Sequence, residues 1–166
     1  GQDLDYGWML SQTGTGSTRR IYVSYVYPTT ASGLAKASGV LRGDEIISID
    51  GVSTNDTTKA TEFNRYLNPS ASGTHTFVFA RTGGAQITTQ LTATTASLPQ
   101  AESSIVIDDQ GVRWGYLLFN SHSQGVETYL VQAISDFKAQ NITELVIDLR
   151  YNGGGYLNIA DRKSVV

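Results

Sequence analysis

The sequence contains no cysteine, and this absence excludes two kinds of site at the outset. Without thiols the chain can form neither disulfide bonds nor thiolate metal centres. Its two histidines, His75 and His122, are too few to build a zinc site by themselves. We therefore expect no metal and no cofactor.

Long apolar runs and a large excess of charge of one sign are also missing. No stretch approaches the ~20 apolar residues that cross a bilayer, so no membrane span is expected. No signal peptide opens the chain, so the protein is either cytoplasmic or already trimmed. The net charge of −3 gives no electrostatic reason to expect nucleic acid as a partner.

What the 166 residues do supply is enough apolar material for one ordinary domain, or for one small domain and part of another. Residues 6–93 are rich in strand-like segments separated by Gly, Thr and Ser clusters, which predicts a small, mostly antiparallel domain. Two helices are expected within it, a short one over GLAKASG and a second over 57–67. The second has Asn55 or Asp56 as its N-cap and Pro69 just beyond its end.

The polar, aperiodic stretch that follows predicts a boundary. We expect a first domain over residues 1–95, a linker over 96–104 and a second domain over 105–166. In the second domain a strand over 112–120 precedes a helix with Ser123 as its N-cap. The near-continuous apolar run Leu145–Leu149 then predicts a strand buried on both faces of a parallel sheet, and the unit reads as βαβ.

The segment LRGDEIISIDGVST, residues 41–54, is the most distinctive sequence motif in the first half of the chain. Asp50 and Gly51 form a strong two-residue turn signal between strand-like segments. Placed between the two expected helices, the segment resembles the PDZ family in the circularly permuted arrangement of bacterial proteases. The resemblance implies an α+β fold whose first part is a PDZ-like, partly open antiparallel β-sandwich with two helices.

A PDZ domain binds an extended peptide as an added strand and holds its terminal carboxylate in a loop of converging backbone amides. Tyr6, Gly7 and Trp8 fit the family pattern of that loop, since glycine lets the amides turn inward as an anion-binding nest. Asp3 and Asp5 place negative charge beside it, which favours low affinity or an internal peptide segment. The residues expected to bind peptide are Tyr6, Gly7, Trp8, Met9, Leu10, Ala60, Phe63, Asn64 and Leu67. The alternative interpretation is that Tyr6, Trp8 and Leu67 are only core residues.

The segment ELVIDLRYNGGGYLNIA, residues 144–160, resembles a motif of the carboxyl-terminal processing (tail-specific) serine proteases. In those enzymes a strand ends in Asp-Leu-Arg and leads into Asn and two glycines, although the proline usual between them is absent here. The resemblance implies that Gly153 and Gly154 belong to a loop whose amide stabilises an oxyanion. A plain glycine turn is the competing interpretation.

The same resemblance places the serine nucleophile, its lysine base and an assisting glutamine downstream of this loop. The chain ends first, so we expect it to be a fragment that does not cleave peptides alone. Ser121, His122 and Ser123 lie together at a predicted turn, where a helix cap explains Ser123 better than a nucleophile does. Lys163 and Ser164 fall in a tail that departs from the family, which favours a truncation, a frameshift or a vector-encoded end.

Three functions are compatible with these features. The leading hypothesis is a fragment of a PDZ-containing tail-specific serine endopeptidase that recognises protein C-termini, from a periplasmic or exported parent by resemblance. The second is a non-catalytic PDZ adaptor that binds C-terminal or internal peptide segments. A nucleotide-binding unit using the glycines as a phosphate loop lacks the required spacing. Exposed strand edges are expected to allow self-association.

Overall fold

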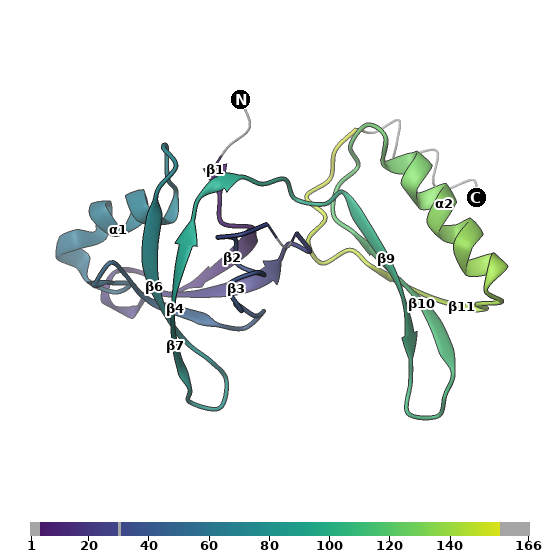
Figure 1. The fold of residues 1–166 in the computed structure, drawn as a ribbon, viewed down its shortest axis with the longest axis horizontal. Coiled ribbons are helices and arrows are strands. Elements are labelled where there is room, and N and C mark those ends of the chain that lie inside the picture. The colour runs from purple at the N-terminus through teal and green to yellow at the C-terminus, as the bar shows by residue number, and fades with distance from the viewer. Residues whose placement is uncertain (1–3, 30, 157–166) are drawn as a thin grey trace. The chain divides into compact units, whose positions relative to one another are not determined.

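The computed structural model describes residues 4–29 and 31–156, and the chain divides after Leu98 into two compact units (Figure 1). The first unit contains an antiparallel sheet and one short α-helix, and the second contains a three-stranded sheet and one longer α-helix. This is the α+β architecture that the sequence predicts. None of the helices over the described residues is long and apolar enough to cross a membrane.

The main sheet of the first unit has the strand order β2-β3-β4-β6-β7, with β5 paired to β4, and every pair is antiparallel. A separate antiparallel pair joins β1 and β8. The strands are β1 (Leu4–Asp5), β2 (Trp8–Thr13), β3 (Arg20–Val26), β4 (Glu45–Ile49), β5 (Val52–Ser53), β6 (Thr74–Ala80), β7 (Gln86–Thr92) and β8 (Thr94–Thr95). The helical segments are η1 (Gly16–Thr18), η2 (Thr57–Lys59) and α1 (Ala60–Leu67).

The core of the first unit is aromatic at its centre. The rings of Tyr6 and Trp8 pack on Phe77 with centroids 5.0 and 5.4 Å away, both edge-on, which is a favourable geometry for aromatic pairs. Phe63 carries the apolar face of α1 into the same cluster and is fully buried. The segment that leads into β2 is therefore anchored by side chains within the core.

The predicted start of the second helix is confirmed and the predicted first helix is wrong. Asp56 caps the helical segment, since its Oδ1 accepts from the Thr58 amide at 2.9 Å. Residues 33–39 instead form hydrogen-bonded turns. Gly33 and Gly39, both with positive φ, bracket a segment with room for a single helical turn.

The turn residues of segment 41–54 are organised by two carboxylates. Asp50 and Gly51 have φ values of 47° and 79°, as a type I′ hairpin turn requires. The Asp44 side chain is buried and accepts from the Arg81 guanidinium at 2.8 and 2.7 Å and from the Leu41 amide at 2.8 Å. The Asp50 side chain, at the other end of β4, accepts from the Thr76 amide of β6 at 2.7 Å. The two carboxylates therefore fix the two ends of β4 to β6 and to the turn after β6.

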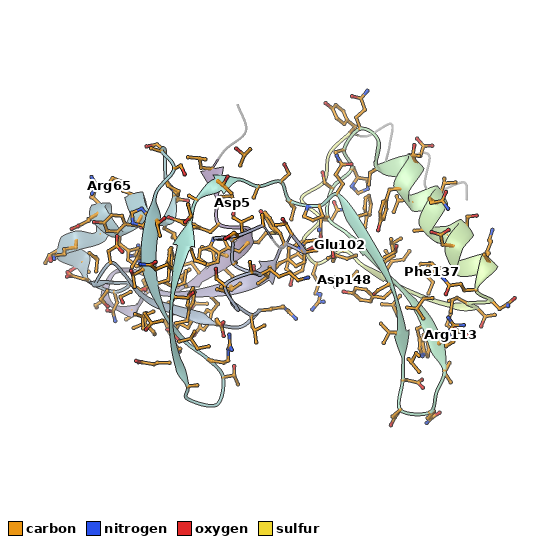
Figure 2. All side chains as sticks on the ribbon, viewed as in Figure 1. Asp5, Arg65, Glu102, Arg113, Phe137 and Asp148 are labelled. Carbon is orange, nitrogen blue, oxygen red and sulfur yellow. The ribbon has the colours of Figure 1, made fainter. Side chains whose placement is uncertain are left out.

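The second unit pairs β10 with β9 antiparallel and with β11 parallel. Its elements are β9 (Ala101–Ile107), β10 (Arg113–Phe119), α2 (Val126–Ala139) and β11 (Glu144–Asp148). Phe137 points from α2 toward this sheet (Figure 2) and packs where Gly115 of β10 leaves space. The predicted βαβ unit is thus present, with one further strand in front of it.

Three expectations for this unit need correction. Residues 101–104, expected in the linker, belong to β9, because an edge strand with a solvated face accepts polar side chains. The N-cap position of α2 is Gly125, with φ 89°, whereas Ser123 makes no side-chain cap. The run Leu145–Leu149 is largely exposed, because β11 lies at the edge of the described sheet and only Asp148 is buried.

Candidate peptide-binding groove and glycine loop

A groove of about 700 Å³ lies between the start of β2 and the end of α1 in the first unit. The hydroxyl of Tyr6 donates to the carbonyl of Tyr66 at 2.8 Å, which ties the groove floor to the last turn of α1. Burial raises the pKa of the Tyr6 hydroxyl well above its usual value, so it remains a donor. The lining residues are Leu4, Asp5, Tyr6, Trp8, Leu10, Leu67, Asn68, Pro69 and Ser70.

The loop before β2 forms an amide nest that already holds a carboxylate. Oδ1 of Asp5 accepts from the amide of Gly7 at 2.6 Å and from the amide of Trp8 at 3.2 Å. Oδ2 of Asp5 accepts from the hydroxyl of Tyr27 at 3.1 Å. Gly7 has a φ of +83°, a conformation that places the two amides on the same side and that other residues rarely adopt.

Backbone hydrogen bonds hold the nest from two further directions. The Tyr27 amide donates to the Gly7 carbonyl at 2.9 Å, and the Ala35 amide donates to the Tyr6 carbonyl at 2.8 Å. Burial, and then the charge of Asp5, raises the pKa of the Tyr27 hydroxyl well above its usual value. The nest is therefore preorganised around the Asp5 side chain.

The structure brings together only some of the residues predicted to bind peptide. Tyr6, Trp8, Leu10 and Leu67 line the groove. Tyr6 and Trp8 also belong to the hydrophobic core. For these two side chains, a role in the groove and a role in the core are therefore compatible.

The remaining predicted residues lie outside the groove lining. Gly7 and Met9 contribute backbone beside it, and Phe63 faces the core with no exposed surface. Asn64 is exposed, and its side-chain oxygen accepts from Arg19 at 2.9 Å. Ala60 lies in the first turn of α1, whereas the groove is lined by residues after its last turn.

Strand β2 offers a free backbone edge next to the groove. In the part of the chain that the structure describes, β2 pairs only with β3. The register of that pair shifts between Met9 and Leu10, and the Ser24 hydroxyl at the bulge donates to the Met9 carbonyl at 3.0 Å. The opposite edge of β2 can accept another strand.

In the second unit, Asp148 terminates β11 and organises the residues after it. Its carboxylate accepts from the backbone amide and the guanidinium of Arg150, at 3.0 and 2.9 Å, and from the hydroxyl of Tyr116. The Arg150 guanidinium holds the pKa of Asp148 far below its usual range, although burial acts to raise it. Asp148 is thus a fixed anion that shapes the chain entering the glycine loop (Figure 2).

Asn152 builds the glycine loop. Its Oδ1 accepts from the Gly154 amide at 2.8 Å, and its Nδ2 donates to the carbonyl of Phe119 at 3.1 Å. His122 contacts the same oxygen through Nδ1 at 3.1 Å. Of the two predicted oxyanion donors, Gly154 is therefore engaged, while the exposed Gly153 amide has no hydrogen-bond partner among the described residues.

The trio at the end of β10 does not form a serine–histidine pair. The hydroxyl of Ser123 is buried and has no hydrogen-bond partner within residues 31–156, and His122 is directed to Asn152. The side-chain oxygen of Asn120 is likewise unpartnered, while its nitrogen donates to the Pro99 carbonyl at 2.9 Å. Lys163 and Ser164 lie outside the described residues.

Several participants escape sequence reasoning. Tyr116 acts through Asp148, 32 residues away, a distance that no local pattern encodes. Asn152 belongs to the motif that the sequence identifies, but its contact with the Phe119 carbonyl, 33 residues away, could not be read from it. Asp5 could have been found, because Asp-x-Gly is a typical Asx turn in which the side chain accepts from the amide two residues on. Across the described residues, no group of three or more histidine or acidic side chains could hold a metal ion.

Comparison with known protein families gives a match, and it lies in the second unit. Residues 113–164 match the model of peptidase family S41. This segment contains β10, α2, β11 and the glycine loop. No curated protein sequence matches the chain.

The fold is similar to that of two solved proteases. One is a photosystem II D1 C-terminal processing protease, at 20% identity and a TM-score of 0.61, with 96% of this chain and 43% of that chain covered. The other is a putative S41 protease from Bacteroides fragilis, at 23% identity and a TM-score of 0.68, with 95% of this chain and 43% of that chain covered. The chain thus spans 43% of the length of each, and its α+β fold is that of these proteases.

Proposed function

We propose that the first unit is a PDZ-like module that binds an extended segment of a protein chain along β2. We further propose that the second unit is the start of the catalytic part of a tail-specific serine endopeptidase of the Ser/Lys type. The observation that carries the proposal is the groove of about 700 Å³ beside the unpaired edge of β2. A peptide laid there gains main-chain hydrogen bonds from strand addition.

Part of the groove lining is aliphatic and suits small or apolar side chains in the bound peptide. Leu4, Leu10 and Leu67 supply aliphatic surface, and the rings of Tyr6 and Trp8 form the floor. Burying one apolar side chain of the peptide contributes about 1.5–3 kcal/mol, which is sufficient for selectivity but not for tight binding by itself. The module is therefore suited to holding unfolded or flexible segments.

The proposed contribution of the second unit to catalysis is an oxyanion donor. The Gly153 amide is exposed and unpartnered among the described residues, and Asn152 fixes the loop on either side of it. A preorganised amide of this kind stabilises charge that develops on a carbonyl oxygen. The nucleophile and base are the serine and lysine that the family resemblance implies.

A non-catalytic peptide adaptor is the second candidate. It is favoured by one observation, namely that the Gly154 amide donates to the Asn152 side chain two residues earlier, as in an ordinary Asx turn. In this case the groove has the same role and the glycine loop is only a turn.

The proposal is tested by calorimetric titration of the chain with an unstructured ten-residue peptide ending in alanine. We expect binding that weakens about tenfold or more in Leu10→Lys, because a long charged side chain replaces aliphatic surface that the peptide would bury. Leu41→Lys is the matched control, since Leu41 is half exposed in a turn that does not line the groove. Absence of binding, or equal weakening in both variants, would exclude the groove.

A further inference from the structure

We infer that Asp5 is a specificity-determining residue that occupies the carboxylate nest of the groove and selects internal peptide segments over free C-termini. The inference rests on the proposed peptide-binding function and defines the chemistry of its ligand. It is carried by the contacts of Asp5 Oδ1 with the amides of Gly7 and Trp8, at 2.6 and 3.2 Å.

The first step is that these two amides are the donors a terminal carboxylate needs. They lie at the start of β2, on the loop that forms one end of the groove. A peptide that adds to the edge of β2 and ends at this loop brings its terminal carboxylate to the same amides. Each backbone amide has one proton to donate, so both are already engaged by Asp5.

The second step is that Asp5 is held rather than loosely placed. The Tyr27 hydroxyl donates to its second oxygen at 3.1 Å, and Tyr27 is itself buried. The Tyr27 amide also donates to the Gly7 carbonyl. Tyr27, the residue directly after β3, therefore fixes both the nest and the Asp5 side chain that occupies it. Displacing Asp5 therefore breaks three hydrogen bonds to a charged acceptor, which are stronger than neutral ones.

The third step is electrostatic. A peptide carboxylate at the nest would lie beside the Asp5 carboxylate, and like charges in a partly buried site repel. Among the described residues that line the groove, none is an arginine, lysine or histidine that could offset the two charges. An internal segment brings no terminal charge and keeps the strand-addition hydrogen bonds, so it is the ligand that the resting groove fits.

The test compares free and amidated forms of the same ten-residue peptide by calorimetry, on the wild-type chain and on Asp5→Ala. We expect the wild type to bind the two forms within about threefold of each other. Asp5→Ala opens the nest and should bind the free carboxylate roughly tenfold to a hundredfold tighter than the amide, as a charge-assisted hydrogen bond predicts. Asp109→Ala, an exposed turn residue of the second unit, is the control for the same change in net charge.

Two further measurements keep the inference testable if Asp5→Ala folds poorly. Asp5→Asn retains an acceptor oxygen in the nest, so it should bind both forms equally. In the wild type, the amide proton resonances of Gly7 and Trp8 should be the same in the complexes with free and amidated peptide.

The outcomes separate the two proposals. A wild-type preference of tenfold or more for the free carboxylate, or an Asp5→Ala variant without that preference, overturns the role of Asp5 and leaves peptide binding standing. Failure of both peptides to bind both proteins overturns the proposed function and the inference with it.

Discussion

Two buried carboxylates illustrate how single residues organise each unit. Asp148 is held by Arg150 only two residues away, so its ion pair shapes a local turn. Asp44 is held by Arg81 from the turn after β6, 37 residues away, so its ion pair ties distant segments together. Burial acts to raise the pKa of Asp44, but hydrogen bonds from Arg81 and the Leu41 amide outweigh it and lower the pKa.

We expect Arg81→Gln to lower the melting temperature of the first unit by roughly 5 °C or more at pH 7, because it leaves the buried Asp44 without its counter-ion. Since the folded-state pKa of Asp44 lies below the unfolded value, the contribution of the pair is fully present above about pH 4. It is lost as the pH falls through the folded pKa, so the two proteins should converge in acid. Calorimetric scans at several pH values measure this.

Lys36→Gln is the control for this experiment, because Lys36 lies exposed on a turn. It removes the same charge and should change the melting temperature by less than about 2 °C. A difference between Arg81→Gln and wild type that grows in acid would contradict the assignment.

At the scale of elements, the contact between α2 and β10 depends on a missing side chain. A Cβ atom added at Gly115 would lie 3.0–3.2 Å from ring carbons of Phe137, which is closer than packed carbons normally approach. A side chain at residue 115 would therefore require the Phe137 ring to shift by a few tenths of an ångström or more.

We expect Gly115→Val to destabilise the second unit by about 1–3 kcal/mol, the typical cost of overpacking. Gly153→Ala is the matched control, because nothing lies within 4 Å of its Cβ position and its φ is not in the positive range. It should change the free energy of unfolding by no more than about 0.5 kcal/mol. Urea titration followed by Trp114 fluorescence, with both variants made in a Trp8→Phe background, measures both. Equal stability of the two variants would refute the packing argument.

The elements themselves were largely accessible from sequence. Hydrophobic periodicity predicts α2 and β10, and turn chemistry predicts the reversal at Asp50 and Gly51. The helix expected over 33–39 fails because its two bounding glycines adopt positive φ, which composition alone does not reveal. Strand β9 was missed because an edge strand needs no apolar alternation.

The candidate site was less accessible, because its contacts are made across long stretches of chain. The pattern at Tyr6, Gly7 and Trp8 predicts an anion-binding loop, but the identity of its occupant follows from side-chain geometry. The hydrogen bonds of Asn152 to the segment after β10 depend on sheet register, which the sequence does not encode locally. The predicted domain boundaries and the predicted oxyanion-stabilising role of Gly153 and Gly154 stay predictions.

At the scale of the whole molecule, the two units differ in the size of their cores. Counting only the residues that the structure describes, the first buries one cluster of fourteen hydrophobic residues and the second buries two clusters of three. The second unit also exposes Leu145, Val146 and Ile147 along β11. Since apolar burial is the dominant stabilising contribution, the second unit should be the less stable one.

We expect limited digestion with a protease of broad specificity to degrade the second unit first and to leave a resistant fragment that ends near residue 98. Trypsin is unsuitable here, because no lysine or arginine lies between Arg81 and Arg113. Mass spectrometry of the time course identifies the fragments. Trimming of the first unit while residues 105–156 remain intact would show that the stability order is reversed.

Backbone hydrogen bonds at His122 hold the end of the glycine loop. The His122 amide donates to the Gly154 carbonyl at 2.9 Å, and the Tyr156 amide donates to the His122 carbonyl at 2.9 Å. Both backbone groups of His122 thus pair with the segment 154–156. The end of the glycine loop is therefore joined by backbone hydrogen bonds to the turn between β10 and α2.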